Sequence, residues 1–486
     1  MRQAFPFSFE LDRKSLVPLA NQIRERLRDH IVGGHLRPGT RLPSARQLAV
    51  YCEVSRITTE NAYRYLQLQG YIHRRAGSGT YVANILPATE SAVRRHRRQR
   101  KDVSLSSTGR MLTVAEPFAQ ASAVPFPHSV PDLGSLPAVL RRLTRRRLTD
   151  DALFDVMAYG DPAGLRSLRQ AIAGRILAHR GVRVSADQVL VTSGAQEAFN
   201  LCARLLLDPG DEAWVEDPCY PPAVAAFRSF GIKVVPVPVD DEGLAVSAGL
   251  KASPTGRLAY ITPSRQYPLG VAMSMQRRKQ LLEWAAARGA WIIEDDYDAE
   301  LGYLERPLET LKSLDTPERV ILVGTFSGTL FPALRLGYMV LPEKLVDPFL
   351  RAKRISSHPA PSVFQGVLED LISEGAFERH VRSMKNIYRE RAQVLLDASR
   401  THWQEFLDLQ PPTGGLFALG WLKSHAKDED ISARLTAHGM AVRPVSPLYI
   451  NQTPRNGLLI GFAALPPGAM ASAARIMSNI MRLAGR

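Results

Sequence analysis

Short apolar runs recur along the chain after residue 129 and alternate with amphipathic helical stretches such as 195–207 and 277–288. Buried parallel strands give near-continuous apolar runs because both faces of their sheet are covered, and each parallel connection needs a crossover helix. The pattern therefore predicts an α/β domain with a mainly parallel sheet and helices on both faces. The predicted strands are 189–191, 213–215, 234–237, 258–261, 291–293, 320–323 and 336–340.

The chain beyond about Arg351 has a different pattern. A long helical segment precedes two apolar runs, 416–419 and 458–462. This arrangement predicts a smaller C-terminal α+β lobe, so the whole of 129–486 forms one large domain with two parts.

Polar groups follow the predicted strands where ligands bind in open α/β sheets, at the carboxyl edge. After the first run, Thr192-Ser193-Gly194-Ala195-Gln196 opens a helix, whose free amides and dipole suit a phosphate, with Ser193 and Gln196 as further donors. Such turns are common between strands and helices, so a purely structural role stays open. Tyr220 follows the next run, where its aromatic face can stack on a flat ring. Further along, 291–293 ends in Glu294-Asp295-Asp296-Tyr297-Asp298, and 320–323 opens into Gly324-Thr325-Phe326-Ser327-Gly328-Thr329.

The amino-terminal quarter is strongly basic. The net charge is +15, and 20 Lys and Arg against 8 Asp and Glu lie before residue 111. This asymmetry suggests a polyanionic partner at that end. The length of 486 residues also predicts two or more domains.

The spacing of apolar and capping residues at this end predicts a winged helix-turn-helix. Apolar residues from Leu16 to Ile31 recur at helical spacing up to Gly33-Gly34, and Ser44 can cap a second helix. Ser55 can cap a third helix, with three residues expected to face inward: Ala62, Tyr65 and Leu66. Two short alternating runs, 71–75 and 80–83, flank a glycine-rich tip and predict a hairpin.

These motifs closely resemble the GntR family of bacterial regulators. The resemblance rests on Pro38-Gly39-Thr40-Arg41-Leu42-Pro43-Ser44-Ala45-Arg46, Val54-Ser55-Arg56 and Gly77-Ser78-Gly79-Thr80, and it covers residues 11–84. It implies that DNA is contacted by Arg41, Ser44, Arg46, Arg56 and Thr58 and by the tip residues Gly77, Ser78 and Gly79. Each arginine alone is typical of a solvated surface, but the set within this framework favours DNA.

Periodicity fades over 85–128, which predicts a flexible linker. Its basic block, 94–101, either adds sequence-independent affinity for DNA or merely keeps the tether soluble. The chain has no apolar stretch long enough to span a bilayer and no apolar signal core, so we expect a cytoplasmic protein. Its cysteines, Cys52, Cys202 and Cys219, lie too far apart to indicate a disulfide framework or a metal site.

The motifs at the sheet edge, together with the preceding segment 159–164, resemble those of a fold-type I pyridoxal-phosphate (PLP) domain. The whole chain resembles the MocR subgroup of GntR regulators. The resemblance implies a domain-swapped homodimer whose PLP-bearing module senses an amino compound and alters DNA binding. It also implies that Asp295 meets the pyridine nitrogen and that Tyr297 bonds the ring phenolate. The phosphate would then be held by the turn 193–196 together with Thr325, Ser327 and Arg335.

Two departures from that family pattern matter. Gly328 stands where the Schiff-base lysine belongs, and Lys312 and Lys344 are misplaced relative to it. Without an amine at this position no internal aldimine and no proton shuttle are expected, so we expect no transaminase activity. PLP would bind noncovalently or arrive already joined to an amine. Residues 456–460 also lack the arginine that usually holds a substrate carboxylate, and Arg455 lies outside that strand, which disfavours a carboxylate-bearing effector.

The leading hypothesis is therefore a DNA-binding transcriptional regulator with a catalytically disabled, PLP-binding sensor. The operator should contain paired repeats, one for each head of a dimer. Two alternatives remain. One is a working aminotransferase with an accessory DNA-binding module, and the other is a regulator whose large domain is a PLP-free dimerisation scaffold.

Overall fold

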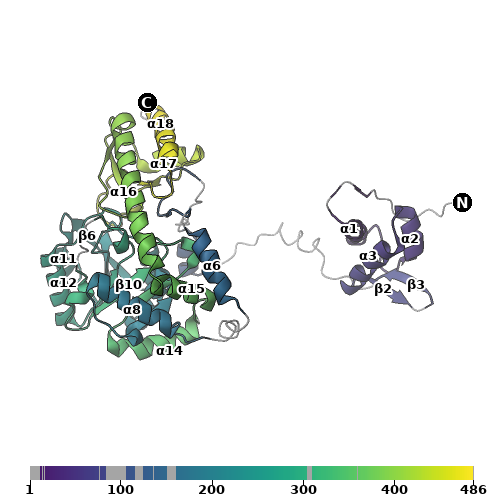
Figure 1. The fold of residues 1–486 in the computed structure, drawn as a ribbon, viewed down its shortest axis with the longest axis horizontal. Coiled ribbons are helices and arrows are strands. Elements are labelled where there is room, and N and C mark those ends of the chain that lie inside the picture. Colours follow the sequence, from purple (N-terminus) through teal and green to yellow (C-terminus); the bar gives the residue numbers. More distant parts are fainter. Residues whose placement is uncertain are drawn as a thin grey trace. The chain divides into compact units, whose positions relative to one another are not determined.

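The computed structural model describes residues 11–13, 15, 17–75, 77–83, 105–114, 124–134, 136–149, 160–303, 309–357 and 359–484. The chain divides into two compact units, Met1–Leu105 and Ser106–Arg486 (Figure 1). Within the described residues, no helix has the length and apolar character needed to cross a membrane.

The described part of the first unit is a winged helix-turn-helix, as predicted. Its elements are α1 (Leu19–Val32), β1 (Arg41–Leu42), α2 (Ala45–Cys52), α3 (Arg56–Leu68), β2 (Ile72–Arg75) and β3 (Gly79–Val82). The strands form an antiparallel sheet in the order β1-β3-β2. Ser44 caps α2 in a capping box with Gln47, and the Ser55 side chain caps α3 by accepting the amide of Thr58.

The inward face of α3 differs from the prediction at one residue. Tyr65 is 44% exposed, whereas Tyr63 is fully buried and donates its hydroxyl hydrogen to the Pro43 carbonyl over 2.8 Å. The reason is the helical period, because Thr59, Ala62, Tyr63 and Leu66 form one stripe at three- and four-residue steps, and Tyr65 lies off it.

The second unit is built on an eight-stranded sheet in the order β4-β11-β10-β9-β8-β5-β6-β7. Pairings among β10, β9, β8, β5 and β6 are parallel, whereas β11 and β7 run antiparallel to their neighbours. All seven predicted strands are present. The strands are β4 (Val189–Thr192), β5 (Glu212–Asp217), β6 (Lys233–Asp240), β7 (Gly243–Leu244), β8 (Leu258–Ile261), β9 (Trp291–Asp295), β10 (Val320–Thr325) and β11 (Gly337–Val340).

Helices cover both faces of this sheet, as predicted. Alternate residues of β10 point to opposite cores: Ile321 and Val323 pack with α9 (Ala195–Leu206), α10 (Pro221–Ser229) and α14 (Val346–Ser356). Leu322 on the other face packs with α8 and α15, and Val320 packs with α11 and α12. The helices of that face are α6 (Pro137–Arg147), α8 (Arg166–Arg180), α11 (Val246–Ala252), α12 (Met275–Arg288), α13 (Leu311–Leu314) and α15 (Ser362–Ser373).

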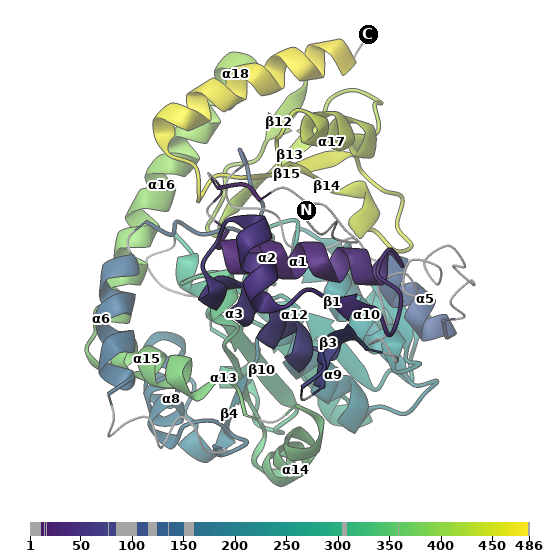
Figure 2. The ribbon, with the colours of Figure 1, turned by 90° about the vertical axis from the view of Figure 1, so that its right-hand side faces the viewer.

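A smaller α+β lobe follows, again as predicted (Figure 2). Its antiparallel sheet has the order β12-β13-β15-β14, and its apolar face packs against the long helix α16 and the C-terminal helix α18. The lobe contains α16 (Ala376–His402), β12 (Leu407–Leu409), β13 (Phe417–Leu422), α17 (Asp428–Ala437), β14 (Arg443–Pro444), β15 (Gly457–Gly461) and α18 (Pro467–Ala484).

The segment expected as a linker has structure in its described residues. Residues Ser107–Val114 form helix α5, and the Phe126 side chain is buried against Trp403 in the small lobe, with ring centroids 5.9 Å apart. The second unit thus begins at Ser106 rather than at 129. The basic block 94–101 lies outside the described residues.

Candidate functional site

The turn predicted to hold a phosphate lies where three strands meet at one edge of the sheet. Thr192 of β4 pairs with Gly337 of β11, which pairs in turn with Thr325 of β10. A Cβ atom on Gly337 would lie only 3.1 Å from both Gly194 Cα and Thr192 Oγ1, so glycine is needed for this close approach. The structure therefore brings the turn 192–196, called the phosphate cradle below, next to Thr325.

Arg335 reaches the same turn from the other side. Its backbone lies in the left-handed region (φ 51°), and a Cβ atom on Gly194 would be 3.6 Å from Arg335 Nη2. The guanidinium group therefore faces the start of α9, where amide groups and the helix dipole already favour an anion. Thr325 and Ser327 lie nearby in sequence, and their hydroxyl oxygens are 3.2 Å apart.

Several donors of the cradle are engaged within the protein. The Ser193 amide donates to Glu197 Oε2 over 2.5 Å, and Gln196 Nε2 donates to the Pro222 carbonyl over 2.9 Å. Burial raises the pKa of Glu197, but its contacts with buried Lys353 and with Ser193 outweigh this and hold it below the usual value. The buried hydroxyl of Thr192, in contrast, has no hydrogen-bond partner among the described residues, so it is available to a bound oxyanion.

Asp295 lies at the end of β9 and is 4% exposed. Its Oδ2 accepts the hydroxyl hydrogen of Tyr260 over 2.7 Å, whereas Oδ1 is buried without a partner in the described structure. Burial raises the pKa of Asp295 to about 7, and nearby acidic groups such as Asp296 add to the shift against the lowering effect of the Tyr260 bond. A cationic N–H group at Oδ1 would complete the hydrogen bonding of this carboxylate and restore its charge.

Tyr220 lies close to both Asp295 and Arg335. Burial raises its pKa to about 12, the negative charge of Asp295 adds to the shift, and the positive charge of Arg335 opposes it. Its ring packs edge to face on Tyr267, with centroids 5.6 Å apart. Tyr220 is therefore placed to contact a flat ring whose nitrogen meets Asp295 and whose anionic group meets Arg335.

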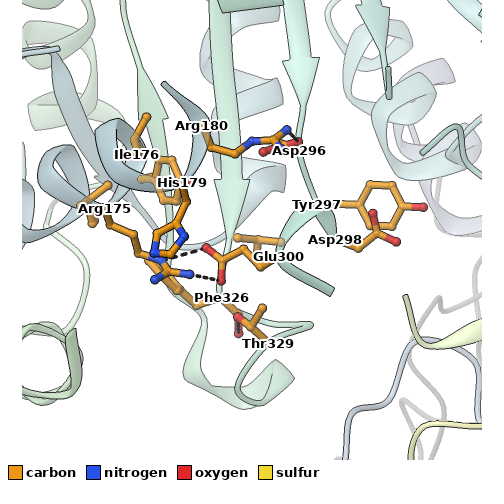
Figure 3. Close-up of a pocket in the computed structure, with 13 residues that line it drawn as sticks. Arg175, Ile176, His179, Arg180, Asp296, Tyr297, Asp298, Glu300, Phe326 and Thr329 are labelled. Atoms are coloured by element: carbon orange, nitrogen blue, oxygen red, sulfur yellow. Dashed lines mark hydrogen bonds and ion pairs between the residues drawn. The ribbon is translucent and has the colours of Figure 1, made fainter. Parts of the chain in front are cut away.

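Gly328 and Tyr297 also lie side by side. A Cβ atom on Gly328 would find Tyr297 O at 3.8 Å and Leu416 Cδ1 at 3.9 Å, which are ordinary contact distances, and its backbone is outside the left-handed region. The local structure therefore does not require glycine here. The Tyr297 hydroxyl accepts a long hydrogen bond of 3.4 Å from Arg265 Nη1, and the same nitrogen donates to Asp298 over 2.6 Å (Figure 3 shows Tyr297 and Asp298).

The two lysines nearest to Gly328 in sequence, Lys312 and Lys344, lie at the edge of the sheet opposite to Asp295 and Thr325. Lys312 Nζ donates to the carbonyl of Val320, the first residue of β10, over 2.9 Å. Lys344 Nζ lies 5.1 Å from the ring centroid of Trp291, the first residue of β9. Asp295 and Thr325 end these strands, so neither ammonium group is on the cofactor side.

Arg443 is a site residue that sequence reasoning missed. It pairs directly with Leu459 across β14 and β15, and Leu459 packs with the aromatic residues around Tyr267. Directly opposed residues of an antiparallel pair point to the same face, so Arg443 also faces the site. Its charge acts on the hydroxyl groups of Tyr220 and Tyr267, lowering a pKa that burial raises in each case. A two-residue strand has no periodic pattern that could have revealed this position.

Arg455, in contrast, packs against an aromatic ring. Its guanidinium carbon lies 4.1 Å from the ring centroid of Trp421, which fixes the side chain by a cation–π contact. Of the residues in the motif 159–164, Tyr159 lies outside the described residues, and the Asp161 carboxylate binds Arg169 at 3.0 Å.

The residues predicted to read DNA are on the surface of the first unit. Arg41, Arg46 and Arg56 are exposed, and a Cβ atom on Gly79 would be 3.1 Å from Arg41 Nε, so the hairpin tip and Arg41 are neighbours. The tip itself needs glycine, because φ is 73° at Gly77 and 123° at Gly79.

Three of the predicted DNA-contacting hydroxyl groups have partners within the fold. Ser44 Oγ donates to Gln47 Oε1 over 2.8 Å as part of its cap, and Thr58 Oγ1 lies 2.7 Å from Ser55 Oγ. Ser78 Oγ of the tip lies 2.7 Å from the Tyr81 hydroxyl. These bonds hold the start of α2, the start of α3 and the wing in fixed geometry.

Comparison with known families matches both units. Residues 19–82 match the family described as bacterial regulatory proteins, gntR family, and residues 130–476 match aminotransferase class I and II. The chain is 36% identical to the probable rhizopine catabolism regulatory protein MocR of Rhizobium meliloti, over 95% of this chain and 93% of that protein. It is 30% identical to the pyridoxine biosynthesis transcriptional regulator PdxR of Corynebacterium glutamicum, over 92% of both chains.

Solved structures resemble the second unit. The α-aminoadipate aminotransferase LysN of Thermus thermophilus, complexed with N-(5'-phosphopyridoxyl)-L-leucine, superimposes with a TM-score of 0.68 at 27% identity, covering 78% of this chain and 95% of that one. A Pyrococcus horikoshii kynurenine aminotransferase complexed with PMP gives a TM-score of 0.68 at 26% identity, covering 80% and 98%.

Proposed function

Because the chain belongs to the MocR-type transcriptional regulators, in which a GntR winged helix-turn-helix is joined to an aminotransferase class I and II domain, we propose that its second unit binds PLP noncovalently. The protein is thus a DNA-binding regulator, and the proposal concerns what its large domain senses. The signal is an amino compound that binds together with PLP, and it changes the affinity of the first unit for DNA.

The unpartnered oxygen of Asp295 is the observation that carries this proposal. A buried carboxylate with one unsatisfied oxygen is costly unless a ligand completes it, and a pyridinium N–H does so. Arg335, Thr192 and the start of α9 would hold the phosphate, Tyr220 would contact the ring, and Tyr297 would bond its phenolate. PLP supplies an aldehyde and an electron-withdrawing ring when bound.

We further propose that the domain lacks transaminase activity. Gly328 has no amine to form a covalent link or to move a proton, and Lys312 and Lys344 lie at the opposite edge of the sheet. Binding energy then comes from the phosphate, the ring and the amino compound alone. The phosphopyridoxyl-leucine complex of the similar Thermus enzyme supports a fold that holds cofactor and amino acid as one unit.

The active form is proposed to be a domain-swapped homodimer that binds an operator with two repeats. Two heads read two half-sites, so the spacing of the half-sites follows from the dimer geometry. An amino compound would act by favouring one arrangement of the heads over another, and it can shift this equilibrium only as far as its affinities for the two states differ.

Equilibrium dialysis of the full-length protein with PLP tests the cofactor proposal. We expect saturable binding that tightens with a panel of amino compounds, no covalent fixation by borohydride, and no keto acid product. Footprinting on DNA upstream of the protein's own gene should show a pair of protected repeats that changes with PLP and the amine. Absence of saturable PLP binding would instead support the PLP-free scaffold, and turnover of an amino donor would support the enzyme.

A further inference from the structure

The outward face of α3 in the first unit (Figure 1) carries an apolar side chain at the start of the helix. Because the buried residues of α3 lie on one stripe, the residues on the opposite side recur at the same three- and four-residue steps. These outward residues are Ile57, Asn61, Arg64 and Leu68. Ile57 is 73% exposed, and among residues 56–63, all of which the structure describes, it is the single exposed apolar side chain.

The start of α3 is held in a fixed position. Ser55 Oγ accepts the amide hydrogen of Thr58 over 3.1 Å, and buried Thr59 Oγ1 donates to the carbonyl of Ala45 in α2 over 2.8 Å. These bonds anchor the first turn of α3 to the rest of the helix-turn-helix. Isoleucine is branched at Cβ, so it has essentially one χ1 rotamer in a helix, and fixing it against a partner costs little side-chain entropy. Ile57 therefore presents a preorganised apolar surface to solvent.

The charged groups near this surface suit DNA. Arg56 precedes Ile57 and is exposed, and its ion pair with Glu60 is a long one of 3.8 Å. Arg46 of α2 is also exposed. Arginines of this kind can bind phosphates or guanine, so they bring the face to the duplex.

Ile57 cannot take part in polar contacts with DNA, because its side chain has no hydrogen-bond donor or acceptor. A single exposed apolar residue needs no explanation on most surfaces, but the first residues of α3 are those that reach base edges in this class of domain. The apolar group that a base edge presents in the major groove is the 5-methyl group of thymine. The chemistry of Ile57 therefore matches one base.

We propose that Ile57 reads a thymine of the operator by packing against its 5-methyl group in the major groove. This contact adds an apolar element to the polar contacts expected from Arg41, Ser44, Arg46, Arg56 and Thr58. The inference rests on the DNA-binding role of the first unit and is independent of the proposed PLP site. Burial of one methyl group predicts an effect of roughly fourfold on affinity.

Deoxyuridine substitution tests the contact, because deoxyuridine pairs as thymidine does and lacks only the 5-methyl group. A consensus sequence is first selected from random DNA with the full-length protein, and each thymine position is then replaced in turn. Fluorescence anisotropy at constant salt measures the affinities. We expect a thymine position at which the replacement weakens binding roughly fourfold. In Ile57→Ala the same replacement should change the affinity less than twofold, and this variant should bind the thymine duplex about as weakly as the unmodified protein binds the deoxyuridine duplex.

Leu68→Ala is the matched control. Leu68 lies on the same outward face and is 76% exposed, but it ends α3, far from the residues that reach base edges. Its removal should leave the deoxyuridine effect at full size. Unchanged melting temperatures show that both variants are folded.

Three outcomes would overturn the proposal: a consensus without a required thymine, a deoxyuridine effect that persists in Ile57→Ala, and one that disappears in Leu68→Ala as well. Specific binding that ignores the methyl group would overturn this inference alone and leave the DNA-binding function intact. Absence of specific binding to any sequence would overturn both.

Discussion

Tyr260 donates its hydroxyl hydrogen to Asp295 Oδ2 over 2.7 Å, and the other oxygen of this carboxylate is buried with no partner among the described residues. The pair spans two neighbouring parallel strands, β8 and β9, whose residues Ile261 and Glu294 are in register. The tyrosine fixes the orientation of the carboxylate, and in the proposed binding mode the free oxygen would accept the pyridinium N–H of PLP.

Asp295→Asn should therefore weaken PLP binding and stabilise the ligand-free protein. The loss of a charge-assisted hydrogen bond of roughly 1.5–3 kcal/mol predicts at least a tenfold weaker PLP affinity. The unfolding free energy of the PLP-free variant at pH 8 should rise by on the order of 1 kcal/mol, because a buried ionised group is removed. Dialysis and thermal melts measure the two effects.

The pH dependence of that stability difference has a definite sign. Burial raises the pKa of Asp295 from 3.8 to about 7, so the folded state prefers the protonated form. The cost of ionisation in the native protein therefore appears as the pH rises above 3.8 and levels off above about 7. The stability advantage of Asp295→Asn should grow over this range, and an advantage that shrinks as the pH rises would contradict this account of the carboxylate.

Gly328→Lys should create a covalent link to PLP. A Cβ atom at this position makes only ordinary contacts, and the backbone is not left-handed, so the lysine is sterically acceptable. We expect a new near-ultraviolet or visible absorbance band and fixation of the cofactor by borohydride, both absent from the natural chain. Gly328→Met is the control for chain length without the amine. Fixation in the natural chain would show that another lysine takes this role.

Sequence patterns predicted the sheet because six of its strands are buried on both faces and form continuous apolar runs, and β6, though only partly buried, is also rich in valine. They missed β7 and β14, each of two residues, and with β14 they missed Arg443, because strands this short have no period. Likewise the Tyr260–Asp295 bond depends on the register of two strands, which no local pattern contains. The cap residues Ser44 and Ser55, in contrast, act through neighbours three residues away and were predictable.

The occupied donors of the cradle illustrate the same limit. The amide of Ser193 and the side chain of Gln196 suit a phosphate by type, yet one is bound to Glu197 and the other to Pro222. The partner of Glu197, Lys353, is 156 residues away. Chemical type and turn geometry could be read from the sequence, whereas the competition for each donor depends on tertiary contacts.

Arg443→Leu should weaken binding of carboxylate-bearing ligands selectively. Arg443 faces Tyr220 and Tyr267 from β14, so it supplies the cation that β15 lacks. The stable conjugate N-(5'-phosphopyridoxyl)-L-leucine should bind at least about tenfold more weakly to the variant, since a charged hydrogen bond is lost. The matching conjugate of isoamylamine, which has no carboxylate, should bind both proteins equally.

Arg455→Leu provides the matched control, because Arg455 stacks on Trp421 and should not contact the ligand. Fluorescence titration measures the affinities of both conjugates for the unmodified protein and for the two variants. If Arg443→Leu weakens both conjugates equally, the arginine supports the fold of the lobe rather than recognition of a carboxylate, and the sequence-based expectation of an effector without a carboxylate is favoured.

Arg56→Ala should lower specific DNA affinity more than the loss of one charge explains. Arg56 begins α3, the helix that enters the major groove in this class of domain, and its only ion pair in the described structure is a long one of 3.8 Å with Glu60. A base-contacting arginine is worth about 1–3 kcal/mol of discrimination, so binding to the selected operator should fall about tenfold or more. Binding to unrelated DNA should fall much less.

Arg64→Ala separates this effect from general electrostatics. Arg64 is exposed on the same helix, nine residues into it, and contacts the Tyr65 ring at 5.9 Å. Removing Arg64 should change neither the ratio of operator to unrelated-DNA affinity nor the order of preferred sequences. If Arg46 contacts a phosphate, Arg46→Ala should weaken binding to all sequences alike and lower the slope of log affinity against log salt by about one. Equal losses for operator and unrelated DNA in Arg56→Ala would place Arg56 on the backbone and remove it from base recognition.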